Sequence, residues 1–63
     1  MRQFASNESV RLVKELPELE LSPGEVGIVR GKWETPFMAY DVEFRSGERA
    51  VRLLLLENHL KAA

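Results

Sequence analysis

The chain has no cysteine and a single histidine, His59. Disulfide bonds and thiolate metal sites are therefore excluded, and so are metal sites built from several histidines. The longest apolar run, Val51–Leu56, is interrupted by Arg52 and is far too short to span a membrane. The first residues also lack the apolar core of a secretory signal. These absences predict a cytoplasmic protein with no membrane segment, no metal and no other cofactor.

Recognisable catalytic patterns are missing as well. His59 has no cysteine to activate, and the serines fall in expected turns or near the N-terminus, where serine commonly bonds to local backbone. Glu18 and Glu20 stand two residues apart in an expected loop, and solvated side chains explain them better than an acid/base pair. No Gly-Lys-Ser/Thr follows the glycines, as a phosphate-binding loop would require. We expect no catalytic residues and no enzymatic activity.

Size and charge narrow the class further. Sixty-three residues make one domain, and a chain of about 60 residues buries only about 60% of the surface that its unfolded form exposes. Nine basic and ten acidic residues give a net charge of −1. Because nonspecific nucleic-acid binding depends on neutralising phosphates, this balance argues against it.

Four segments predict β-strands. Alternation is cleanest in 39–45, where Tyr40, Val42 and Phe44 share one face and charged residues share the other. The four expected strands are Ser9–Leu16, Glu25–Trp33, Ala39–Arg45 and Arg49–Leu55.

Glycine and proline indicate where the chain turns. Pro23-Gly24 suits the centre of a type II turn, in which glycine takes a positive φ. Gly27 and Gly31 lie inside one expected strand, where glycine usually marks a bulge, a bend or a close approach of another backbone. Ser46-Gly47 is expected to form the centre of a tight hairpin.

The last third of the sequence allows two interpretations. Arg49–Leu55 can form a strand or begin a helix, because leucine, arginine and alanine are good helix formers. The preceding hairpin turn and the need to cover the edge of the neighbouring strand favour the strand. We expect one helical turn over Leu56–Leu60, with Leu60 returning to the core and Lys61–Ala63 forming a brief strand or a frayed end.

Together these patterns predict an all-β fold, a small, partly open barrel of four to five strands with one short helical turn near the C-terminus. Residues 1–8 are expected to be a loose arm and residues 9–63 the barrel. Nine residues are expected to be largely buried: Val10, Leu12, Val29, Tyr40, Val42, Phe44, Val51, Leu53 and Leu60. Of the two loop leucines, Leu19 and Leu21, at least one should cap the core.

The order of these motifs resembles the SH3-like barrels. It runs through Val10-Arg11-Leu12, Gly24–Val29, Tyr40–Phe44 and the Leu56–Leu60 turn. It is similar to KOW modules, to the ferredoxin-docking PsaE subunits of photosystem I, and most of all to short stand-alone bacterial and cyanobacterial domains of unknown function. The resemblance covers roughly residues 9–61 and implies a fold rather than an activity. The chain departs from KOW modules in lacking a net basic surface, and from the photosystem subunits in its acidic Leu16–Ser22 loop.

The turn after residue 32 concentrates apolar bulk where surface is expected. Its candidate partner-binding residues are Trp33, Pro36, Phe37 and Met38. Aromatic residues are enriched in interface hot spots, and methionine adapts to varied partners. Alternatively, Trp33 and Phe37 fold back and plug one end of the barrel, because so short a chain has few large residues to display.

A second candidate surface is basic, and its members are Arg30, Lys32, Arg45, Arg49 and Arg52. The ordinary interpretation of such residues is a solvated surface of mixed charge. The sequence therefore predicts a non-enzymatic protein-interaction module, an accessory or regulatory partner of a larger assembly, with an unknown protein partner and a monomeric or weakly dimeric state. The alternative is a barrel that binds nucleic acid weakly or associates with the ribosome through the basic residues.

Overall fold

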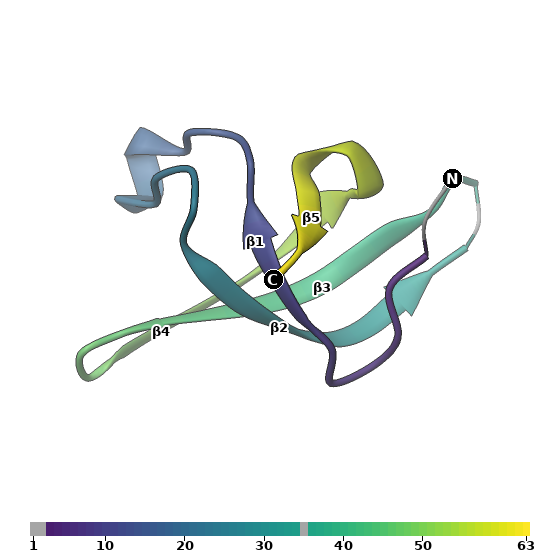
Figure 1. Ribbon diagram of the computed structural model, residues 1–63, viewed down its shortest axis with the longest axis horizontal. Helices are drawn as coiled ribbons and strands as arrows, with labels where there is room; N and C mark the ends of the chain where they lie inside the picture. Colours follow the sequence, from purple (N-terminus) through teal and green to yellow (C-terminus); the bar gives the residue numbers. More distant parts are fainter. Residues whose placement is uncertain (1–2, 35) are drawn as a thin grey trace.

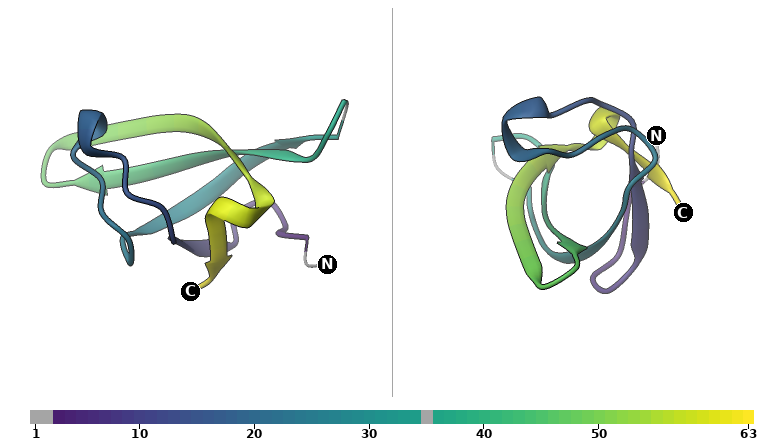
Figure 2. Two further views of the ribbon diagram at one scale, coloured as in Figure 1. Left: turned by 90° about the horizontal axis from the view of Figure 1, so that it is seen from above. Right: turned by 90° about the vertical axis from the view of Figure 1, so that its left-hand side faces the viewer.

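The computed structural model describes residues 3–34 and 36–63, and for Ser46 the backbone only. Five strands form one antiparallel sheet in the order β4-β3-β2-β1-β5 (Figure 1). The elements along the chain are β1 (Ser9–Leu12), the 3-10 turn η1 (Pro17–Leu19), β2 (Val26–Trp33), β3 (Ala39–Ser46), β4 (Arg49–Leu56), the 3-10 turn η2 (Glu57–His59) and β5 (Leu60–Ala62). Viewed end-on, the sheet curls into a partly open barrel (Figure 2). The predicted all-β class is confirmed, and the region from Arg49 is a strand rather than a helix.

Two local predictions need correction. The strand expected to reach Leu16 ends at Leu12, and Leu16 instead exchanges backbone hydrogen bonds with Leu21 at 2.9 and 3.1 Å, which closes a narrow loop around η1. The hairpin between β3 and β4 has Gly47-Glu48 at its centre, one residue later than expected, because Ser46 pairs with Arg49. Gly47 takes a φ of 62°, and glycine in the first position of a two-residue loop is the type II′ pattern.

Glycine shapes β2 and the turn before it. At the Pro23-Gly24 turn, Gly24 has a φ of 95° and the Glu25 N–H donates to the Ser22 carbonyl at 3.2 Å, as predicted for a type II turn. Gly27 marks a close approach, since a Cβ there would lie 2.7 Å from Val42 Cγ1. The register between β2 and β3 shifts between Val29 and Gly31, which is the position of a β-bulge. The bend expected within β2 is therefore present.

The core lies inside the curl of the sheet. Seven of the nine expected core residues are buried, while Val51 and Leu53 on β4 are only half-buried. The core also takes in Leu55, which the alternation within β4 directs inward, and Leu21, which caps it from the loop.

Phe4 belongs to the core as well. Its ring meets Tyr40 edge-on, with centroids 5.3 Å apart, and its N–H donates to the Tyr40 hydroxyl at 3.1 Å. Further along, the Asn7 N–H donates to the Val29 carbonyl. The described part of the arm that was expected to be loose, residues 3–8, is thus held against the barrel, and alternation could not reveal this because Phe4 stands outside any strand.

Candidate partner-binding surface

The turn between β2 and β3 displays the aromatic side chains that the sequence singled out. Trp33 is 61% exposed and Phe37 is 62% exposed. Pro36 is also exposed, while Met38 is half-buried and packs against the core. The alternative in which Trp33 and Phe37 plug one end of the barrel is therefore wrong.

The β-bulge in β2 explains why Trp33 faces outward. Side chains alternate along a strand, so without the bulge Trp33 would share the face of buried Val29, four residues earlier. The extra residue at the bulge reverses the alternation, and Lys32 rather than Trp33 then stands opposite buried Tyr40. The large ring is thereby moved from the core side to the solvent side.

Neighbouring strands extend the apolar surface around Trp33. Trp33 pairs with Ala39, and Ala39 pairs with Leu56, so the three lie side by side on the outer face of the sheet. Leu54, two residues before Leu56 on the same face, is 61% exposed. Phe37, Met38 and Leu56 line one shallow groove together with two polar residues of η2. We call Trp33, Phe37, Met38, Leu54 and Leu56 the tip patch.

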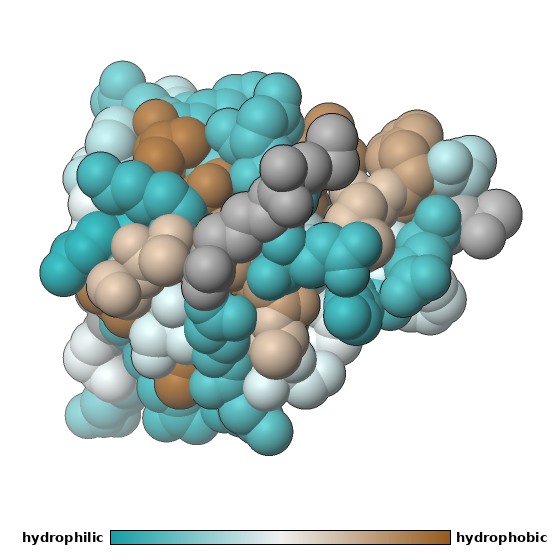
Figure 3. Space-filling model, turned by 45° about the vertical axis from the view of Figure 1, so that its right-hand side comes forward, coloured by the Kyte–Doolittle hydropathy of each residue, from teal (hydrophilic) through white to brown (hydrophobic). Residues whose placement is uncertain are grey.

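The tip patch lies where the molecule projects from its body. In Figure 3 apolar side chains emerge on this projecting end beside strongly hydrophilic ones. Leu54 and Leu56 were not among the candidate residues. The run of four leucines at 53–56 could have indicated that Leu54 and Leu56 are exposed, because in an alternating strand two of the four must face outward.

The residues of η2, Glu57, Asn58 and His59, add polar side chains at this end of the barrel. Glu57 and Asn58 line the groove, and within the described residues the buried Oε2 of Glu57 has no hydrogen-bond partner. The Leu56 N–H donates to Nδ1 of His59 at 3.2 Å, which requires that nitrogen to be unprotonated. Burial, and secondarily the charge of Lys14, lower the pKa of His59 and so favour this neutral form.

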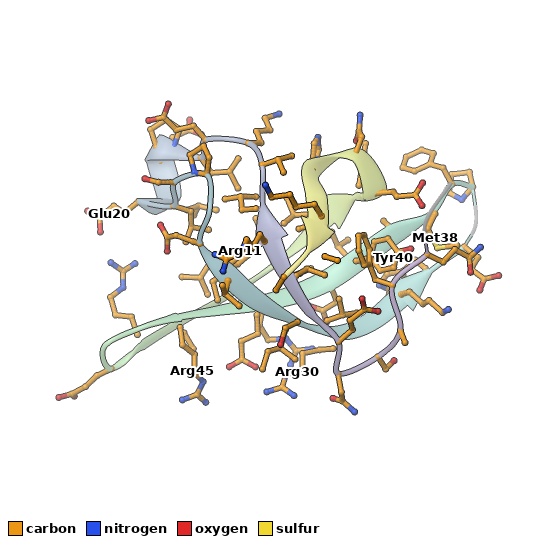
Figure 4. All side chains as sticks on the ribbon, in the orientation of Figure 1. Arg11, Glu20, Arg30, Met38, Tyr40 and Arg45 are labelled. Atoms are coloured by element: carbon orange, nitrogen blue, oxygen red, sulfur yellow. The ribbon has the colours of Figure 1, made fainter. Side chains whose placement is uncertain are left out.

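The five basic residues of the second candidate surface do not form a single patch. Arg30 and Arg45 both donate to Glu43, at 2.9 and 3.2 Å, and project from the same side of the sheet (Figure 4). The hydrogen bond from Arg30 is the main cause that lowers the pKa of Glu43. Arg52 pairs with Asp41 on the adjacent strand.

Arg49 lies apart from these three. It shares the inner side of β4 with Val51 and donates to Glu20 of the loop at 3.1 Å. Lys32 has no ion pair among the residues that the structure describes, and it too stands on the inner side. Each of the four arginines in the basic set therefore contacts a carboxylate, and the predicted set is divided between two faces.

Other kinds of site find no support in the described parts of the chain. Residues 3–34 and 36–63 contain no cluster of three or more acidic, histidine or cysteine side chains suited to a metal ion. The same residues include no helix of the length and apolarity needed to cross a membrane.

Comparison with protein-family models, with curated protein sequences and with solved structures found no match for this chain.

Proposed function

We propose that this chain is a non-enzymatic protein-interaction module, an accessory or regulatory partner of a larger assembly, and that it binds through the tip patch. The observation that carries the proposal is the outward placement of Trp33 and Phe37 beside exposed Leu54 and Leu56. Contiguous exposed apolar surface on a small domain marks an interaction site. Tryptophan at the centre of such a surface is typical of an interface hot spot.

The groove beside the patch indicates which partner chemistry fits. Its apolar wall is formed by Phe37, Met38 and Leu56, and its polar end by Glu57 and Asn58. A buried carboxylate oxygen without a partner costs free energy that a hydrogen-bond donor recovers. A segment that inserts an apolar side chain and places a lysine, arginine or backbone N–H near Glu57 would match both features.

The test compares two double variants of the tagged protein in pull-downs from its native cell. Trp33→Ser with Phe37→Ser removes the two exposed rings of the tip patch. Val13→Ser with Val26→Ser is the matched control, because these residues are also large, apolar and exposed but lie elsewhere. We expect both variants to keep the wild-type circular dichroism spectrum, and only the first to lose the proteins that co-purify with the wild type.

Two results would contradict the proposal. One is unfolding of the Trp33/Phe37 variant, which would place the rings in the core. The other is equal retention of partners by both variants.

The nucleic-acid alternative gains no support from the arrangement of the arginines, because Glu20, Asp41 and Glu43 neutralise three of their four charges locally. The nucleic-acid alternative predicts that the amide chemical shifts of Arg30, Lys32 and Arg45 change when short single-stranded RNA or DNA is added at low salt. We expect these shifts to stay unchanged.

A further inference from the structure

β4 forms one edge of the sheet and is long for that position. It has eight residues, pairs with β3 on one side, and has no partner strand on the other side among the described residues. Proteins usually protect an edge strand by keeping it short or by interrupting it with proline or inward-pointing charge. β5, at the opposite edge, has only three residues, whereas β4 reads RAVRLLLL without proline. The one inward-facing charge of β4, Arg49, stands at the first position of the strand and pairs with Glu20.

The hairpin geometry identifies which backbone groups β4 leaves free. Ser46 and Arg49 close a two-residue turn and therefore form a hydrogen-bonded pair, after which bonded and non-bonded pairs alternate. Val51, Leu53 and Leu55 thus direct their backbone groups toward β3. Ala50, Arg52, Leu54 and Leu56 direct theirs away from it. The Leu56 N–H fits this alternation, since it donates to His59 rather than to β3.

Both faces of this edge carry apolar side chains. Val51 and Leu53 stand opposite Phe44 and Val42, which are buried, yet they remain half-buried themselves. The loop around η1 approaches Val51, where Leu19 and Leu21 line a hollow beside it, but it leaves Val51 and Leu53 partly exposed. On the outer face, Leu54 is largely exposed.

One antiparallel register makes the edge complementary to itself. With a two-fold axis at Leu53, Arg52 pairs with Leu54 of a second copy and Val51 with Leu55 of that copy, while the two Leu53 side chains meet. The same register brings Arg49 toward Glu57 of the second copy, which has the opposite charge. An axis at Arg52 would instead oppose two arginines, and like charges directly across a strand pair are destabilising.

We infer that two copies of this chain form a homodimer by pairing their β4 edges in this register, which continues the sheet from one copy into the other. The interface is isologous, as in most two-fold dimers. It satisfies the free backbone groups of Arg52 and Leu54 and covers the half-exposed side chains of Val51 and Leu53. The dimer does not require the partner that we propose for the tip patch, although Leu54, Leu56 and Glu57 lie beside both surfaces.

A single cysteine tests the register, because the natural chain has none. Leu53 faces its own copy in a non-hydrogen-bonded pair, where Cα atoms lie about 4.5 Å apart, within the range for a disulfide. Leu53→Cys should therefore form a covalent dimer under mild oxidation. Val51→Cys is the matched control, since the two copies of residue 51 would be separated by about four residues of strand, roughly 13 Å. Equal cross-linking of the two variants, or none in either, would overturn the register.

A second measurement removes the hydrogen bonds without removing a side chain. A chemically synthesised chain with N-methyl-Leu54 loses only an N–H on the free edge. Sedimentation should show a dimer for the wild type and for Trp33→Ser with Phe37→Ser, and a monomer with an unchanged circular dichroism spectrum for the N-methyl chain. A wild type that stays monomeric at high concentration would overturn the dimer. Dissociation of the Trp33/Phe37 variant alone would move the interface to the tip patch and overturn the assignment to the β4 edge.

Discussion

Gly27 lies where the curled sheet leaves no room for a side chain. A Cβ at this position would lie 2.7 Å from Val42 Cγ1 and 2.8 Å from Phe44 Cε1, and both side chains are buried and tightly packed. Gly31, four residues later on the same strand, has no such neighbour within 4 Å. The two glycines of β2 therefore have different roles, one in packing and one in the bulge.

We predict that Gly27→Ala lowers the free energy of unfolding by about 1–3 kcal/mol, the usual cost of overpacking a core. Gly31→Ala, the matched control, should change it by less than about 1 kcal/mol. Urea denaturation of the two variants measures the difference. A Gly27→Ala protein as stable as the wild type would show that the strands can move apart at this point.

Protonation of His59 is expected to make the stability of the fold depend on pH. Its pKa is lowered in the folded chain, so the unfolded chain binds more protons between that lowered pKa and about 6.5. The stability that neutral His59 provides is therefore fully present above about pH 6.5 and is lost as pH falls through the folded pKa.

We predict that the urea concentration at the unfolding midpoint of the wild type decreases as the pH is lowered from about 7.5 to about 5.5. This pH range stays above the ordinary carboxyl pKa values of about 4. His59→Gln does not titrate and should show a flatter profile over the same range. Parallel profiles for the two proteins would contradict a role for His59 in this dependence.

At the scale of elements, strand positions could be predicted from alternation and turn residues, but the direction of Trp33 could not. β2, β3 and β4 lie within about a residue of their expected bounds, because alternation marks β3 and turn residues mark where the strands on either side of it begin or end. The bulge between Val29 and Gly31 shifts the alternation of β2, and it determines that Trp33 faces solvent. A glycine inside a strand indicates a bulge or a bend without saying which.

Long-range contacts account for the other differences. Phe4 was left outside the expected core because its partner, Tyr40, is 36 residues away. Val51 and Leu53 were expected to be buried because the alternation places them on the inner face of the strand. The alternation does not show whether another element covers that face. The ion pairs of Arg30 and Arg45 with Glu43 also depend on the register between strands, which the sequence does not specify.

The cluster of Glu43 with Arg30 and Arg45 joins β2 to β3, and it supplies a test of the nucleic-acid alternative. Glu43→Gln removes the carboxylate that the guanidinium groups of Arg30 and Arg45 share, and so removes one negative charge beside two positive ones. We predict that this variant gains weak, salt-sensitive binding to single-stranded RNA in a fluorescence titration, while the wild type shows none. Binding by the wild type that equals or exceeds that of the variant would favour the alternative over the protein-interaction proposal.

For the whole molecule, a small barrel closes its core largely with β1–β5, the loop around η1 and the segment before β1, and leaves two apolar regions open. One is the tip patch and the other is the β4 edge, and the two meet at Leu54 and Leu56. A domain of this size has little stability to spare, so exposed apolar surface in two places is better explained by contacts with other molecules than by the needs of the isolated fold.

The most direct test of this account is the fluorescence of Trp33, the only tryptophan in the chain. We predict that the folded protein emits at a wavelength close to that of free tryptophan, that acrylamide quenches the emission readily, and that unfolding in urea changes it little. Addition of a partner that binds the tip patch should shift the emission to shorter wavelength and protect it from acrylamide. Short-wavelength, protected emission from the dilute folded chain alone would place Trp33 in the core and contradict the tip patch as a binding surface.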